Sequence, residues 1–455
     1  MRTSSGPGAR TSGGPAARTG GPAGELRHWG EALTAVLAAV VAMVAVAAIG
    51  LYFAGANDLP SGGYGSVVAA TVLMACGASA RVEGGAAFVA GAKGGIEAVP
   101  LSVALTGALL LGWLFLRPMR LHATVSGREL LARVGRVAVL WAAALLLLSI
   151  PAEKSFVVST GEPLIDELGG LVGGSPTVGF AVDTGRAVGL GLLWLAVVLL
   201  LALAVSRRTP LPLPLLRFHS TVRPAAHAVL TLLLVYVALA LPAGLVEAAV
   251  GGHARQTLAV VFLGLPNLAW LALGIGMGGS WHGHVDGTLG LPMPQPLAGV
   301  LKQNQDVRLD AATLTDQDSR TWLLVALAVV ALLLTGVGMA MHAPPGIKAW
   351  RHAVHLAVAL AVAMLLIGVL TRISAAYGLT LLGFGGSGAA VLEPDLLVLV
   401  AVGAVWGAVA GLIGGWTAAR VRHDAVHAAE HPPQPGEEPK DGGPGASGAQ
   451  SRSVP

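Results

Sequence analysis

The chain has 455 residues, of which 54% are hydrophobic and only 11% are charged, and its mean hydropathy is +0.73. A soluble globular protein carries about a quarter charged residues, so this composition excludes a water-soluble protein and predicts an all-α polytopic membrane protein. The formal net charge of +4 is small, and the basic residues lack interleaved aromatic residues, which argues against a nucleic-acid partner. The single cysteine, Cys76, excludes an intrachain disulfide and a thiolate metal cluster.

Polar segments occupy both ends of the chain. Residues 1–28 are mostly Gly, Pro, Ser, Ala and Arg, and residues 422–455 are rich in Pro, Gly and Glu. Neither segment offers an apolar face, so we expect two disordered tails. The first tail is too long for a signal peptide, and a full-length apolar run follows it. Residues 29–421 between the tails are predicted to form one transmembrane helical domain.

Eight apolar segments reach or nearly reach the roughly 20 residues that a helix needs to cross a bilayer. Tryptophans lie near several of their ends, where the indole ring suits the headgroup layer. The eight predicted spans are Ala32–Phe53, Val99–Leu116, Arg133–Ile150, Ala187–Val205, Pro224–Leu245, Thr321–Met341, His352–Thr371 and Leu396–Ala418.

Two further apolar segments are ambiguous. Ser66–Ala80 is short and contains several Gly, Ala, Thr and Ser residues. Thr257–Met277 is long enough to span, but Pro266 and Asn267 interrupt it at the middle, where proline removes a helix hydrogen bond. Both segments are interpreted as re-entrant or interfacial, and if both crossed the bilayer the number of spans would rise to ten.

The distribution of charge supports the eight-span topology. The segment from Arg117 to Arg136 carries five arginines and one acid, and basic loops between spans are retained on the cytoplasmic side. With eight spans, three cytoplasmic loops hold eleven basic residues against one acid, Glu129, while most acids fall in the outer loops. We therefore expect a multi-pass protein of the cell membrane with its N- and C-termini in the cytoplasm.

The predicted outer loops contain signs of a small β-structure. Short alternating or β-branched pieces are separated by glycine pairs, which favours hairpins. Pairing between the first two loops would form an extracytoplasmic cap, and in the third loop Leu309–Asp318 is predicted to be a surface helix. The expected strand pieces are Ala80–Glu83, Gly95–Val99, Ser155–Ser159 and Thr177–Val182.

Two groups of residues are candidates for a functional site. Pro266 and Asn267 could break a helix and expose backbone groups to a substrate or ion, as in transporters. The simpler interpretation is a kinked helix whose Asn267 side chain bonds a neighbour. His282 and His284 would point to the same side of an extended strand and could bind zinc or copper, but they lack a convincing third ligand and are better explained as solvated loop residues.

Several phrases of the sequence resemble the streptophobe family. They include RHWGEALTAVLAAVVAMVAVAAIGLYFAGA, IDELGGLVGG, LGLPNLAWLALGIGMG and PDLLVLVAVGAVWGAVAGLIGGW. The resemblance covers about residues 27–420, and members of that family are very hydrophobic actinobacterial membrane proteins of uncharacterised function. It implies a membrane protein and carries over no site residue.

The sequence gives little direct evidence of an activity. Motifs of the common intramembrane enzymes are absent, so no enzyme activity, catalytic residue, resident metal or cofactor is expected. No titratable side chain lies at the centre of a predicted span, which weakens the case for an ion-coupled carrier. We favour a transport or permease-like protein whose partner is the lipid bilayer. The alternative is a non-transporting envelope or scaffold protein that binds protein partners or lipids through its loops.

Overall fold

The computed structural model describes residues 22–59, 62–86, 90–121, 126–157, 177–206, 213–285, 307–344, 346–381 and 384–430. Within these ranges eight helices are long and apolar enough to cross a membrane, which confirms the predicted class. The long helices are α1 (Pro22–Phe53), α4 (Gly127–Ala152), α6 (Thr184–Val205), α7 (Leu213–Val250), α8 (Ala254–Gly276), α11 (Trp322–His342), α12 (Ala349–Thr371) and α13 (Leu396–Glu430). The shorter helices are α2 (Gly63–Ala75), α3 (Leu101–Leu116) and α10 (Ala311–Gln317).

The ends of the chain differ from the expected tails in one respect. Helix α1 begins at Pro22, inside the first segment expected to be a tail, and α13 continues to Glu430. Residues 1–21 and 431–455 lie outside the described residues.

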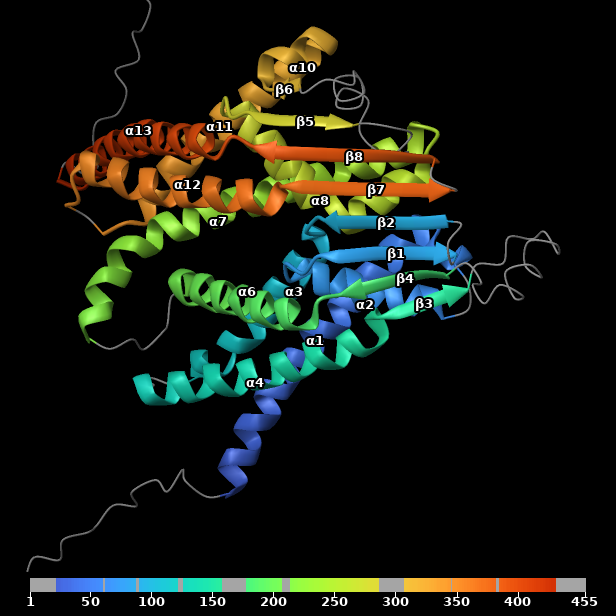
Figure 1. The fold of residues 1–455 in the computed structure, drawn as a ribbon. Helices are drawn as coiled ribbons and strands as arrows, with labels where there is room; N and C mark the ends of the chain where they lie inside the picture. The colour runs from blue at the N-terminus through green and yellow to red at the C-terminus, as the bar shows by residue number, and fades with distance from the viewer. Residues whose placement is uncertain are drawn as a thin grey trace, which may run out of the picture.

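An eight-stranded antiparallel sheet extends from one end of the helical bundle (Figure 1). Its strand order is β3-β4-β1-β2-β7-β8-β5-β6, and each strand directly follows or precedes a helix end. The pairing of β1 with β4 joins the two loops that were expected to pair and confirms this pairing, and the sheet is larger than expected. The strands are β1 (Ala80–Ala86), β2 (Ala90–Glu97), β3 (Lys154–Val157), β4 (Thr177–Val182), β5 (Trp281–Val285), β6 (Val307–Leu309), β7 (Ile373–Leu381) and β8 (Phe384–Pro394).

Alternation of side chains makes the sheet amphipathic next to the bundle. Residues paired across strands share a face, and Trp281 lies opposite both Leu309 and Pro394. Trp281 and Leu309 are fully buried, whereas the adjacent His282 is exposed. Helices α2 and α8 lie behind the sheet in Figure 1, so the apolar face is covered and the polar face is left to solvent.

The set of long helices differs from the predicted spans at two places. Thr257–Met277 was expected to be interrupted, but α8 is a continuous 23-residue helix with Pro266 inside it. The expected break is therefore wrong. Val99–Leu116 becomes α3, a helix of only 16 residues, and Ser66–Ala80 contributes the 13-residue α2.

Helix α8 lies across the sheet end of the bundle. Asn267 contacts the first turn of α3, and an added Cβ at Gly276 would meet the carbonyl oxygen of Leu324 near the start of α11. Both contacted helix starts are at the end where the strands begin. The length and composition of α8 suit a span, and its placement as an interfacial segment stays a prediction from the charge pattern.

The helices and strands that the structure describes follow the same order twice along the chain. Two helices, a strand pair, two more helices, a second strand pair and a final helix run from α1 to α6 and again from α7 to α13, with α10 as an insertion. The sheet repeats this order, because β3-β4-β1-β2 is followed by β7-β8-β5-β6. The two halves meet where β2 pairs with β7.

The C-terminal ends of α2 and α8 match in detail. Gly77 and Gly278 have φ of 98° and 94°, a left-handed conformation that glycine adopts without a Cβ penalty. Each helix ends in the paired hydrogen bonds of a Schellman motif, from Ala78 N–H to the Leu73 carbonyl and from Gly279 N–H to the Gly274 carbonyl. A buried serine follows each motif, at Ser79 and Ser280. This agreement supports an internal duplication.

The helices that end the two halves match in sequence as well. Asp183, Gly191 and Trp194 in α6 recur at identical spacing as Asp395, Gly403 and Trp406 in α13. Each aspartate accepts a hydrogen bond from the first turn of its helix. Added Cβ atoms at the two glycines would meet Leu145 of α4 and Met364 of α12, which are the corresponding side chains of the two halves.

The basic segments gather at the end of the bundle away from the sheet. Arg133 near the start of α4 lies 3.7 Å from Glu31 of α1. Arg422 of α13 donates to the carbonyl oxygens of Ala340, in the last turn of α11, and of Ala343, which follows that helix. The bundle therefore has a basic end, opposite the end that carries the sheet.

Candidate functional site

A large apolar cavity lies between the two halves and is open at its side, where lining side chains such as Val358 and Leu193 are 60% and 59% exposed. Its volume is about 1640 Å³, above the 300–1,000 Å³ of a pocket for a small molecule. Helices α3 and α6 of the first half and α7 and α12 of the second half line it. Along its length the lining is leucine, valine and alanine, represented by Leu105, Leu193, Leu230, Val362 and Leu366.

One group of polar side chains in the lining lies at the sheet end of the cavity. Ser79, Glu97, Arg186 and Arg372 are placed there because each lies next to a strand. Arg186 Nη1 is 3.6 Å from Glu97 Oε1, which is an ion pair longer than a hydrogen bond. Both side chains are about half exposed, at 49% and 56%.

Arg372 lies on the second half of the same cavity end. It ends α12 and donates through Nη2 to Oε1 of Glu393 in β8. Its side chain is 59% exposed. The sheet end of the cavity thus carries two guanidinium groups and one carboxylate.

The opposite end of the cavity carries histidines. His227 of α7 and His355 of α12 belong to the lining, as does Ser206 at the end of α6. The cavity therefore has an apolar middle and two polar ends, as a lipid bilayer has a hydrocarbon core between two headgroup layers.

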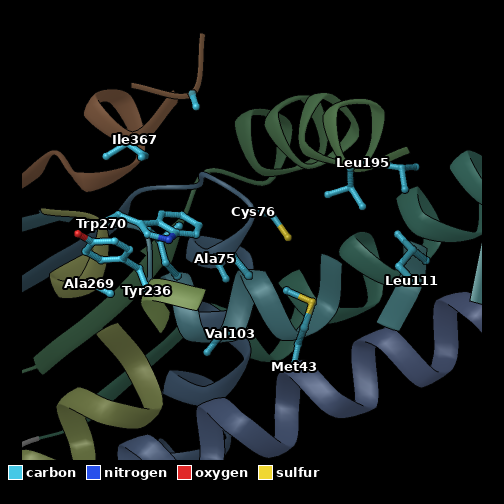
Figure 2. Close-up of a cluster of buried hydrophobic side chains, with 14 of the residues drawn as sticks. Met43, Ala75, Cys76, Val103, Leu111, Leu195, Tyr236, Ala269, Trp270 and Ile367 are labelled. Carbon is cyan, nitrogen blue, oxygen red and sulfur yellow. The ribbon is translucent and has the colours of Figure 1, made fainter. Parts of the chain in front are cut away.

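Aromatic residues pack beside the cavity (Figure 2). Tyr236 and Trp270 lie against each other with Ile367 close to them, and Trp270 and Ile367 belong to the lining. Trp270 donates its indole N–H to the carbonyl of Leu233. This bond fixes α8 against α7 and shapes the cavity wall.

Cys76 lines the cavity where α2 ends. It is 2% exposed, and burial raises the pKa of its thiol to about 12. A buried thiol with a raised pKa remains protonated near neutral pH and is a poor nucleophile. Cys76 therefore contributes apolar surface rather than chemistry.

Pro266 and Asn267 lie outside the cavity lining, beside the start of α3. Asn267 accepts a hydrogen bond from Leu101 N–H at 3.1 Å and donates to the Val99 carbonyl at 3.0 Å. The amide thus satisfies backbone groups at the start of α3, as the simpler interpretation of this residue predicts.

Ser102 of α3 bonds the turn of α8 that precedes Pro266. Its hydroxyl donates to the Val261 carbonyl at 2.9 Å and accepts from Leu265 N–H at 3.2 Å. These two backbone groups would pair with each other in an unbroken helix, so the hydroxyl is inserted into the hydrogen-bond ladder of α8. We call Ser102 and Asn267 with their backbone partners the α3–α8 clasp. The sequence analysis did not predict the role of Ser102, because this residue is far along the chain from its partners in α8.

His282 and His284 lie in β5. His282 is opposite Glu393 of β8 and Arg308 of β6, and it is exposed. Among the described residues no group of three or more His, Cys, Asp or Glu side chains is placed to hold a metal ion. The two histidines therefore lie on the sheet, away from the cavity between the halves.

No protein-family model, curated protein or solved structure matches this chain. The interpretation of the site accordingly rests on its own geometry.

Proposed function

We propose that this integral membrane protein is a permease-like carrier for a lipid-like amphiphile, whose chain occupies the cavity between the halves. The observation that carries the proposal is the apolar lining over the whole middle of a cavity of about 1640 Å³. An acyl or isoprenoid chain gains free energy by leaving water for such a surface, whereas a polar solute would lose its hydration there without compensation.

The proposal replaces the expected substrate path at Pro266 with a path between the halves. Asn267 is engaged in the clasp, so it does not offer free polar groups to a solute. The cavity needs no titratable side chain at its centre, in keeping with the sequence. The resemblance to the streptophobe family remains part of the proposal and adds no activity to it.

A matched pair of substitutions tests the occupant. Val362 of α12 lines the cavity and is 52% exposed, while Val330 of α11 is 55% exposed and lies outside the lining. We expect Val362→Trp to abolish binding of a fluorescent single-chain amphiphile to the purified protein, and Val330→Trp to leave binding unchanged. Equal loss, or no loss in either variant, would contradict the proposal. Movement of the same probe between leaflets of reconstituted vesicles tests the carrier step.

We further propose that the sheet faces outward and the basic end faces the cytoplasm. The basic loops support this orientation, because Lys and Arg are retained inside. A cysteine placed at Gly127 in a Cys76→Ala background should resist a membrane-impermeant maleimide in intact cells. Labelling from outside would contradict the proposed orientation and indicate the opposite one. The alternative function, an envelope scaffold, is favoured by the breadth of the eight-stranded sheet, and co-purification of a stable protein partner on that sheet would support it.

A further inference from the structure

We infer that the sheet end of the cavity selects an amphiphile with a phosphate-bearing headgroup, held by Arg186 and Arg372. This inference rests on the proposed function, since it assigns the headgroup of the molecule whose chain fills the cavity.

The positions of the two arginines support it. Arg186 comes from the first half and Arg372 from the second, and both line the same cavity at the same end. A chain lying among α3, α6, α7 and α12 would bring its headgroup between them. Guanidinium groups recognise phosphate oxygens through paired hydrogen bonds and stay charged at all relevant pH values.

The existing ion pairs leave both guanidinium groups able to bind. Arg186 contacts Glu97 only at 3.6 Å, and Arg372 bonds Glu393 through Nη2 alone among the hydrogen bonds of the described residues. A guanidinium group has five N–H donors, so each arginine retains donors for a ligand. Half exposure of both side chains also lowers the desolvation needed to bind.

A substitution at Glu97 changes the affinity for a phosphate headgroup in a direction that a purely structural role would not produce. The Glu97 carboxylate lies in the lining beside Arg186 and would repel a phosphate. Glu97→Gln should therefore strengthen binding of a phosphate headgroup, whereas loss of a structural ion pair would weaken it or have no effect.

The experiment measures binding of four fluorescent amphiphiles with the same alkyl chain to the full-length protein in detergent. Their headgroups are a phosphate monoester, phosphocholine, trimethylammonium and neutral glycerol, and inorganic phosphate is added as a fifth probe. We expect the phosphate monoester to bind most tightly, and Arg186→Gln or Arg372→Gln to weaken it roughly tenfold. Neither substitution should change binding of the glycerol probe.

Arg308→Gln is the matched control, because Arg308 lies at the same edge of the bundle, pairs with Asp310 and does not line the cavity. If a glutamine variant fails to fold, Arg186→Lys and Arg372→Lys should still show a smaller loss, since the charge remains without the planar fork. Equal affinity for phosphate and glycerol probes would overturn the headgroup inference and leave the carrier proposal standing. Binding of inorganic phosphate as tight as that of the amphiphile would overturn it in favour of a free anion. Failure of every chain-bearing probe to bind would instead overturn the proposed function.

Discussion

The two halves share one order of elements, yet their final helices pack in opposite ways. Along α13, added Cβ atoms at Gly407 and Gly411 would lie 2.6 Å from backbone atoms of α12, so the two helices touch through their main chains. At the matching positions α6 carries Leu195 and Leu199, which are buried and hold the neighbouring helices further away. Small residues permit close helix approach in lipid, and large ones prevent it. The last two helices of the second half are therefore closely packed. In the first half α6 stands further from its neighbours, and the cavity lies beside it.

The largest expected effect comes from replacing Gly407 of α13 with leucine, the residue found at the matching position of α6 (Leu195). Gly407→Leu would drive a side chain into the Ala357 Cα and the Leu356 carbonyl, each 2.6 Å from the added Cβ. Backbone cannot move aside cheaply, so we expect a loss of about 4 kcal/mol or a failure to fold. Thermal unfolding in detergent measures the loss. Gly338→Leu in α11 is the control, because a Cβ added at Gly338 meets nothing within 4 Å.

The reciprocal change tests the loosely packed half. Leu195 is 2% exposed, and Leu195→Ala should destabilise the protein by about 3 kcal/mol through lost burial and a residual cavity. Leu200→Ala in the same helix removes a side chain that is 66% exposed and should cost far less. If Leu195→Ala were neutral, α6 would collapse onto α4 as α13 does onto α12, and the comparison between the halves would fail.

The α3–α8 clasp tests how firmly the halves are joined. Asn267→Ala leaves Leu101 N–H and the Val99 carbonyl without their side-chain partner, and we expect a loss of about 2 kcal/mol. Ser102→Ala should add to this loss, and a double-mutant cycle measures the coupling between the two residues. Additive losses would show two independent hydrogen-bond sites rather than one clasp.

The smallest effect is expected at alkaline pH. Burial raises the pKa of Cys76 from its ordinary value of 9.0 to about 12, so folding favours the protonated thiol. The associated stability is complete below about pH 9 and is lost as the pH rises toward 12, and the loss at pH 10 is about 1.4 kcal/mol. We expect Cys76→Ala to flatten the decline of melting temperature over this range. An unchanged slope would show that the thiol is not the group that titrates.

Local patterns in the sequence predicted much of the architecture. Apolar length gave the helical class, and alternation with glycine pairs gave β1 and β4 and their pairing. The surface helix expected at Leu309–Asp318 is α10, whose capping box at Asp310 and Thr313 was legible in sequence. Strands β7 and β8 were missed because glycine- and alanine-rich segments have weak β-propensity and acquire order from neighbouring strands.

The candidate site depends on contacts between residues that are far apart in the sequence, and local sequence patterns do not predict such contacts. Proline at position 266 predicts a broken helix, but α8 is continuous, and Ser102, remote in sequence, bonds the turn that precedes the proline. The cavity is formed by four helices from two halves, and none of its lining residues carries a motif. One signal was available: the repeated spacing of Asp183, Gly191 and Trp194 in Asp395, Gly403 and Trp406 would have revealed the duplication.

The junction between β2 and β7 also constrains how the chain folds. Glu97 of β2 lies opposite Ser374 of β7, so the central pairing of the sheet joins residues that are far apart along the chain. During synthesis from the N-terminus, the first four strands can pair while β2 keeps an open edge until β7 has been made. Long-range strand pairing is slow, and open edges invite incorrect pairing with other chains. A truncated first half should therefore associate with other copies of itself through the open edge of β2. In the full chain β7 of the second half covers this edge.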